Sequence, residues 1–320
     1  MEFPKVTVII PLWAVGERFF NNLEQFRKID YPDFEVFVVS DREVELPSGP
    51  FRLILTGKER TGPAEKRDAA LREAHGEILA FIDDDAYPRS DWIKKAVRHF
   101  SNPLIAGVGG PGVTPSEDSI SARAGGAVYE SFFGSGPLRY RFRPLGSVRE
   151  VDDYPAYNLF FRKEFLIKVG GWGTTFYGGE DTKVCLEIVK ADGKIVYDPD
   201  VVVCHHRRPL FREHLRQVAN VGRHRGYFVK KYAETSRRLI YFIPSLLSIG
   251  YIFFCALSFV YSSVRTIFLL CNGILLVLFF LSAPSKNPLV RGLASLGILF
   301  HHLTYGIYFL KGLFTRELER

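Results

Sequence analysis

The sequence lacks several features that would place it in well-known structural classes. It has only four cysteines and no CxxC spacing, so neither a disulfide framework nor a thiolate metal site is indicated. No GxxxxGK(S/T) loop is present, which argues against a P-loop phosphate cradle. Residues 1–6 lack the basic start and long apolar core of a signal peptide, so we expect the folded domain to stay in the reducing cytosol.

The charge is biased toward positive, with a net charge of +7. Much of the excess lies in two basic runs, residues 139–149 and 207–238. Neither run carries a recognisable nucleic-acid-binding signature, and an apolar tail follows the second one. These features favour membrane lipid and a phosphate-bearing ligand as partners, and no nucleic acid.

Short apolar strands alternate with helical patterns in the first 232 residues. The expected strands are 6–12, 35–39, 78–82, 105–108, 157–161, 194–197 and 201–204, and the expected helices are 17–28, 64–75, 91–100, 163–169, 180–191 and 212–232. This alternation predicts an α/β fold, a doubly wound and mostly parallel sheet with helices on both faces. Ligands of such sheets gather at the carboxyl ends of the strands. The segment 109–150 has no sustained period, and we expect a long functional loop there.

The last part of the chain holds three apolar stretches, 239–261, 266–283 and 289–313. The first two have the ~20 residues that a membrane-spanning helix needs, whereas charged residues and histidines interrupt the third. We therefore predict a catalytic domain over 1–232 and a membrane domain over 233–320 with two to three transmembrane or interfacial helices.

The basic residues around these stretches bear on the topology. Those that precede the first stretch, and Lys286 and Arg291 after the second, favour a multi-pass protein with a cytosolic catalytic domain. Arg316 and Arg320 disagree if all three stretches cross the membrane. The third stretch would then lie in the interface or form a hairpin.

Three carboxylates follow the apolar run Ile78-Leu-Ala-Phe-Ile. Strand alternation puts Asp83 and Asp85 on one side, where they can share Mg²⁺ or Mn²⁺ and leave positions for phosphate oxygens. Such a cation neutralises the charge of a departing nucleoside diphosphate. Asp84 faces the other way and is assigned to donor binding. The competing interpretation is an acidic turn that caps the following helix.

A second acidic pair, Glu180 and Asp181, follows two glycines at the start of a predicted helix. The free N–H groups of a helix N-terminus keep a carboxylate ionised, which suits a general base that deprotonates an acceptor hydroxyl. The alternative is simple N-capping.

Histidines and arginines follow the last predicted strand. His205 is a candidate third ligand of the same metal, although histidines at strand ends are more often hydrogen-bonded structural residues. Arg216 and Arg223 on the next helix are candidates for binding the diphosphate or anionic lipid. Lys66 and Arg67 open another helix and would face the phosphates. Asp41 would accept a hydrogen bond from an N–H group of the nucleotide base.

Taken together, these residues resemble the family 2 glycosyltransferases, an inverting group with the Rossmann-like GT-A fold. The resemblance runs from Val6 to about Tyr227 and rests on the blocks VTVIIPL, EVFVVSD, GPAEKRDAALREAHGEILAFIDDDAYP, YNLFFRKEFLIKVGGW and GGEDTKVCLEIVKADGKIVYDPDVVVCHH. It implies that Pro11 and Asp41 line the base pocket, with Lys66 and Arg67 near the donor. It also implies that Asp83 and Asp85 form the DxD motif.

The same resemblance assigns Asp181 as the catalytic base, with Glu180 beside it contacting the acceptor. Three departures from the family pattern stand out: Asp68 occupies the place of a common Asn, Ser40-Asp41-Arg42-Glu43 replaces the common DDGS continuation after the second strand, and the QxxRW motif of processive enzymes is absent. The expected function is transfer of a single sugar from a nucleoside-diphosphate sugar to a polyprenyl-linked or saccharide acceptor. The alternatives are a metal-dependent nucleotidyl- or phospho-transferase at the membrane and a scaffold with a decayed site.

Overall fold

The computed structural model describes residues 3–176 and 178–318, which form two compact units. The first unit contains the chain up to Val113 together with Arg143–His206. The second contains Thr114–Phe142 and the chain from Arg207 onward. The segments 114–142 and 207–232 therefore pack with the apolar helices. The functional division at residue 232, catalytic before it and membrane-bound after it, stays a prediction.

An eight-stranded sheet forms the centre of the first unit, in the order β3-β2-β1-β4-β9-β6-β10-β8. In chain order its strands are β1 (Val6–Pro11), β2 (Phe34–Ser40), β3 (Phe51–Leu55), β4 (Ile78–Ile82), β6 (Ile105–Gly109), β8 (Arg149–Val151), β9 (Asn158–Arg162) and β10 (Lys194–Tyr197). Strand β9 is antiparallel to its neighbours β4 and β6, and β8 is antiparallel to β10, while the remaining pairs are parallel. The predicted α/β class with a mostly parallel sheet is confirmed.

Burial on both faces explains the apolar runs of the central strands. Every residue of β1 and β4 is buried. The helices of this unit are α1 (Glu17–Phe26), α2 (Pro63–Glu73), α3 (Trp92–Val97), the 3₁₀ turn η1 (Arg98–Ser101), α6 (Lys163–Lys168) and α7 (Glu180–Lys190). Helix α1 buries Phe19, Leu23 and Phe26 at helical spacing, which is the pattern of an amphipathic helix on a sheet.

A small second sheet in the same unit consists of β5 (Ala86–Pro88), β7 (Gly112–Val113) and β11 (Val203–His205). Strand β11 lies between β5 and β7, and its register pairs His205 with Ala86. Because Ala86 directly follows the three carboxylates, this pairing brings His205, near the C-terminal end of the first unit, next to the end of β4.

The second unit is helical, and it corrects the expectation of an irregular loop over 109–150. Much of that segment is ordered as α4 (Ile120–Glu130), α5 (Phe132–Ser135) and the 3₁₀ turn η2 (Gly136–Arg141). Ser119 caps α4 by accepting a hydrogen bond from the Ala122 N–H, and α4 packs on α12 (Pro288–Phe314). The glycine- and alanine-rich sequence hid this helix, since small residues give no apolar period but allow close packing.

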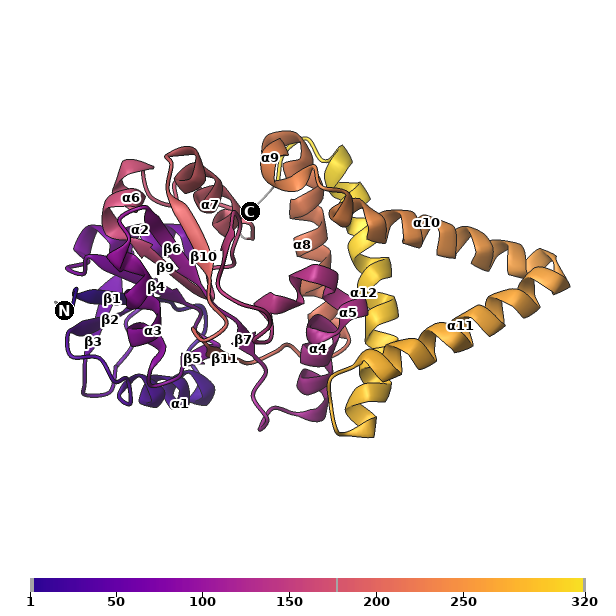
Figure 1. Cartoon of the computed structure of the whole chain (residues 1–320), viewed down its shortest axis with the longest axis horizontal. Helices are drawn as coiled ribbons and strands as arrows, with labels where there is room; N and C mark the ends of the chain where they lie inside the picture. Colours follow the sequence, from indigo (N-terminus) through magenta and orange to yellow (C-terminus); the bar gives the residue numbers. More distant parts are fainter. Residues whose placement is uncertain (1–2, 177, 319–320) are drawn as a thin grey trace. The chain divides into compact units, whose positions relative to one another are not determined.

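The remaining helices of this unit are α8 (Arg212–Lys231), α9 (Ala233–Ser236), α10 (Leu239–Val260) and α11 (Ser262–Ser282), drawn in orange to yellow with α12 in Figure 1. By length and composition α10, α11 and α12 can each cross a membrane. A core of Ala124, Ala127 and Val128 from α4 meets Ala294 and Ile298 of α12.

Candidate active site

The carboxylates after β4 lie beside His205, because β11 pairs with β5 in the small sheet. One ligand atom each from Asp83, Asp85 and His205 lies within 4.8 Å of the others. The His205 Nε2 is 3.0 Å from the Asp85 Oδ1, and the buried imidazole packs at 4.6 Å against the Tyr157 ring. Two carboxylates and one imidazole on a rigid strand end form a donor set that fits a divalent cation.

Electrostatics at Asp83 point the same way. Burial raises the pKa of Asp83, the Arg67 guanidinium opposes that shift, and the neighbouring Asp85 adds to it. A carboxylate pair in such a place favours a nearby positive charge. The residues present therefore fit the metal that the sequence predicted.

Asp84 has a different set of contacts from its two neighbours. Its Oδ2 accepts hydrogen bonds from the Trp13 N–H at 2.7 Å and the Ala14 N–H at 3.4 Å. Burial, and next the charge of Asp85, raise the pKa of Asp84 to about 7. Asp84 thus holds the loop that follows β1, and its predicted contact with the donor stays a prediction.

Arg67 joins the two acidic clusters. Its Nη2 lies 3.0 Å from the Asp83 Oδ1, and its Nη1 lies 2.8 Å from the Glu180 Oε1. The buried guanidinium stacks 4.5 Å from the centre of the Trp172 ring. An arginine fork held on an aromatic face fixes the geometry of both of its carboxylate partners. The sequence suggested only a donor contact for Arg67, and this link between segments more than a hundred residues apart was missed.

The acidic pair itself sits at the first turn of α7. Gly178 and Gly179 precede it with φ of 114° and 79°, a backbone region that side chains disfavour. Glu180 accepts a hydrogen bond from the Gly178 N–H at 3.0 Å. The Asp181 Oδ1 accepts one from the Thr182 N–H at 2.8 Å.

Burial raises the pKa of Asp181 to about 7, and the charges of Glu180 and Asp153 add to the shift. Asp153 is itself buried and accepts a hydrogen bond from the Thr182 hydroxyl at 3.2 Å. A carboxylate with this pKa gains and loses a proton near neutral pH, which is the property of a general base. Asp153 gave no local signal in the sequence, because its position beside α7 depends on the fold.

Asp41, partly buried at the end of β2, pairs with the buried Lys66, with 3.0 Å between the Lys66 Nζ and the Asp41 Oδ2. Asp41 also accepts hydrogen bonds from Thr56 and Thr61. Burial alone would raise the pKa of Asp41, but the hydrogen bonds lower it to about 2, the largest contribution coming from Thr61. These contacts order the loop before α2, and the assignment of both residues to the donor stays a prediction.

Asp68, the residue that departs from the family pattern, has a structural role. Its carboxylate accepts hydrogen bonds from the Trp172 N–H at 2.8 Å and the Gly173 N–H at 3.0 Å. It therefore fixes the turn that places Trp172 under Arg67.

The first unit brings most of the predicted site residues into one structure. Pro11 ends β1 and is buried, and its predicted place in the nucleotide-base pocket stays a prediction. Arg216 and Arg223 lie on α8 in the second unit, and their predicted role in binding the diphosphate stays a prediction.

The fold and the acidic site define a class, the α/β enzymes with a candidate site for a divalent cation at a strand end. The sequence profile described as Glycosyl transferase family 2 matches residues 7–169, which is half of the chain. The chain belongs to this family.

Similar proteins include the pre-mycofactocin glycosyltransferase of Mycobacterium tuberculosis (strain ATCC 25618 / H37Rv). It is 29% identical over 161 residues, covering 50% of this chain and 33% of the relative. The chain thus spans about a third of the length of this relative.

A match along nearly the whole chain comes from Methanococcus voltae. Its dolichyl N-acetyl-alpha-D-glucosaminyl phosphate 3-beta-D-2,3-diacetamido-2,3-dideoxy-beta-D-glucuronosyltransferase is 23% identical over 327 residues, covering 96% of this chain and 97% of the relative. Among solved structures, the mannosyltransferase PcManGT from Pyrobaculum calidifontis, in complex with GDP-Man and Mn²⁺, matches with a TM-score of 0.63 at 20% identity. That match covers 99% of this chain and 89% of the other, and it confirms the expected GT-A fold.

Proposed function

We propose that this chain is a membrane-anchored, inverting glycosyltransferase that transfers one sugar from a nucleoside-diphosphate sugar to a polyprenyl-linked acceptor. One observation carries the proposal: Arg67 contacts both Asp83 of the candidate metal site and Glu180 of the acidic pair. A donor diphosphate and an acceptor hydroxyl need these two sets of groups within the length of one sugar.

The strand-end cluster provides the donor half of the site. Asp83, Asp85 and His205 would hold Mg²⁺ or Mn²⁺, whose chemistry is to neutralise the charge of the leaving diphosphate. Arg67 keeps Asp83 oriented, and Asp84 keeps the loop after β1 in place. Asp41 would line the pocket for the nucleotide base of the donor, and Lys66 would lie near the donor.

Asp181 provides the acceptor half. It takes the proton of an acceptor hydroxyl as that oxygen attacks the anomeric carbon, and the nucleoside diphosphate leaves from the opposite face. One in-line displacement inverts the anomeric configuration. Glu180, oriented by Arg67 and the Gly178 N–H, contacts the acceptor beside it.

The need for a base favours a saccharide hydroxyl as the nucleophile. A polyprenyl phosphate presents an oxygen that is already ionised at neutral pH, whereas a sugar hydroxyl must lose a proton. We therefore favour a polyprenyl-linked saccharide as the acceptor. The dolichyl-linked substrate in the name of the Methanococcus voltae relative supports this class.

The charge pattern indicates the side of the membrane on which the catalytic unit lies. Lys230, Lys231, Arg237 and Arg238 precede the apolar helix α10, which favours a cytosolic catalytic unit in a multi-pass protein.

The test is a panel of nucleotide sugars with Mn²⁺ or Mg²⁺, with a membrane lipid extract as the acceptor source. We expect metal-dependent release of a nucleoside diphosphate together with a labelled lipid product. Turnover confined to nucleoside triphosphates would instead favour a nucleotidyl- or phospho-transferase. Absence of both turnover and metal-dependent nucleotide binding would favour a scaffold.

Arg139, Arg141 and Arg143 are expected to bind the phosphate of the lipid acceptor, because they form a basic run in a segment near the predicted membrane boundary. Replacing all three by glutamine should raise the KM for the lipid acceptor at least about tenfold, the effect of losing roughly one charged hydrogen bond. Donor hydrolysis in the absence of acceptor is the control and should not change. An unchanged KM for the lipid acceptor would remove these arginines from the proposal.

A further inference from the structure

Helix α12 is apolar enough to cross a membrane, yet it is paired along most of its length with the charged helix α8. Figure 1 shows the two helices side by side within the second unit. At one end of the pair a Cβ on Gly297 would lie 3.0 Å from the Leu210 side chain. At the other end the Lys230 Nζ donates to the Thr315 carbonyl. The two helices therefore run parallel over the full length of α8.

Their backbones touch in the middle of the pair. A Cβ on Gly226 would come within 2.1 Å of the Phe309 carbonyl oxygen, and a Cβ on Gly312 would come within 2.1 Å of the Arg223 carbonyl oxygen. The His214 Nε2 lies 3.3 Å from the His301 Nδ1 at the start of the pair. Such close contact leaves no room for lipid between α8 and α12, so α12 cannot pass into the core of a bilayer without α8.

Helix α8 is too polar for the hydrocarbon core of a bilayer. Its charged residues are Arg212, Glu213, Arg216, Arg223, Arg225, Lys230 and Lys231. Each charge placed near the bilayer centre costs free energy, and acidic partners for these arginines and lysines are few on this helix. If α12 crossed the membrane, the pairing would draw α8 into the hydrocarbon with it.

The exposed face of α12 is mostly apolar, although Lys311 is also exposed on it. Its exposed side chains include Leu289, Leu296, Phe300, Ile307 and Phe314, spaced four or seven residues apart. This spacing puts them on one stripe of the helix. A helix with a polar partner on one side and an apolar stripe on the other is suited to the plane where lipid headgroups meet acyl chains.

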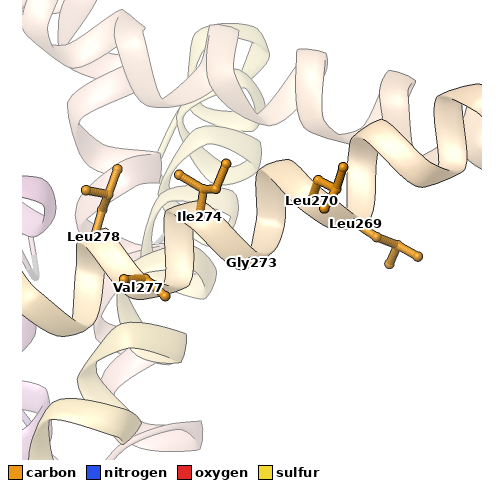
Figure 2. A pocket seen from close by; sticks show the side chains of 6 residues that line it. All are labelled: Leu269, Leu270, Gly273, Ile274, Val277 and Leu278. Carbon is orange, nitrogen blue, oxygen red and sulfur yellow. The ribbon is translucent and has the colours of Figure 1, made fainter.

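The other two apolar helices have the opposite character. Helices α10 and α11 contain 22 and 21 residues and expose most of their side chains. An apolar hollow on α11 is lined by leucines, Ile274, Val277 and Gly273, and none of these lining residues carries a polar side chain (Figure 2). At about 1.5 Å per residue each helix is about 32 Å long, close to the thickness of a bilayer core.

This pair meets α12 at two separate places. The Ser245 hydroxyl of α10 bonds to the Gly306 carbonyl, whereas the Arg291 side chain of α12 bonds to the Phe280 carbonyl at the end of α11. These points lie about 22 Å apart along α12, while the far ends of α10 and α11 are joined at Tyr261. Helix α12 therefore runs across the open base of an α10–α11 hairpin (Figure 1).

We propose that only α10 and α11 cross the bilayer, and that α12 lies in the membrane interface on the side from which α10 enters. The outward stripe of α12 contacts the lipid there, and α8 remains on the aqueous side of it. This inference rests on the membrane attachment proposed above. It places Lys286, Arg291 and Arg316 on the same side as the basic residues before α10, which removes the conflict that three spans create.

Cysteine labelling of the full chain in sealed membrane vesicles tests the topology. Single cysteines are introduced at exposed positions in a background without the four native cysteines: Lys28→Cys in the first unit, Ser263→Cys at the hairpin tip and Arg316→Cys after α12. A membrane-impermeant maleimide is applied to vesicles of each orientation. Glu317→Cys is a second reporter for the last position, and labelling after detergent treatment shows that each cysteine is reactive.

We expect the cysteine at position 316 to react from the same side as the one at position 28, and the cysteine at position 263 to react only from the other side. Reaction of positions 316 and 263 from one side would overturn the proposal, because three spans put them together. Release of the protein by alkaline carbonate, with all positions labelled alike, would overturn it through the loss of membrane attachment. That result would leave glycosyl transfer in the soluble fraction measurable, so the two failures are distinguishable.

Discussion

The two units of the chain handle buried polar groups in different ways. The first unit buries charges beside one another, as at Arg67 between Asp83 and Glu180. The second joins its helices through backbone contacts at glycines and through hydroxyls, such as that of Ser295, which donates to the Leu276 carbonyl. Burial raises the pKa of a carboxylate and costs stability, but it supplies a reactive group. Small residues and hydroxyls hold helices together where surrounding lipid removes the hydrophobic driving force.

This difference implies that single substitutions in the first unit should change chemistry more than stability. Substitutions at the helix contacts of the second unit should do the reverse.

The largest effect is expected for Asp181→Asn. Loss of the proposed general base should lower kcat for transfer to a hydroxyl acceptor about 10³-fold. The pKa of Asp181 is raised in the folded state, so its ionisation disfavours folding as pH rises from about 4 to about 7. The variant should therefore unfold at the same temperature as the native protein or a higher one at pH 8. A kcat within threefold of the native value would reject the assignment of Asp181 as base.

The next largest effect is expected at the candidate metal site. Asp83→Asn, Asp85→Asn and His205→Ala should each weaken Mn²⁺ binding, measured by calorimetry, by more than the roughly 10- to 100-fold that a lost outer-shell partner costs. His206→Ala is the matched control, because the His206 Nε2 lies 3.2 Å from the Asn22 Oδ1 instead of joining the cluster. Equal Mn²⁺ affinity in the His205 and His206 variants would show that His205 is structural.

The pH profile gives a smaller and more specific effect. The proposed base Asp181 would act in its ionised form, so log kcat should fall by about one unit per pH unit below about pH 7. Asp84 also has a pKa raised to about 7, so Asp84→Asn is the control variant. Its amide oxygen can still accept the Trp13 N–H, and the acid limb should persist. Disappearance of the limb in that variant would assign it to Asp84.

The smallest change in activity is expected at the contact between α8 and α12. In Gly312→Ala the new Cβ would meet the Arg223 carbonyl oxygen at 2.1 Å, and overpacking of this kind costs about 1–3 kcal/mol. Gly292→Ala on the same helix meets nothing within 4 Å and should be neutral or stabilising. Thermal unfolding in detergent measures both. Equal unfolding temperatures of the two variants, or loss of donor hydrolysis in Gly312→Ala at low temperature, would contradict the expectation that substitutions at this contact change stability more than chemistry.

Local patterns were sufficient where one segment makes a structure by itself. Strand β4 and the carboxylates after it were predicted because a buried strand must be apolar and its end must be polar. Helix α7 was predicted with its glycine break and acidic start. Strands β5 and β7 were missed, because segments of three and two residues hold their shape only by pairing with β11.

The sequence by itself determined the family, the mostly parallel sheet, the carboxylates at the end of β4 and the apolar tail, since each follows from residues adjacent in the chain. Tertiary structure alone decided that Arg67 links Asp83 to Glu180, and it chose between the two interpretations of His205 by placing that side chain beside Asp83 and Asp85. It also decided that α12 packs along a charged helix. Distances between segments far apart in sequence depend on strand register and helix packing, and no local pattern of residues encodes either one.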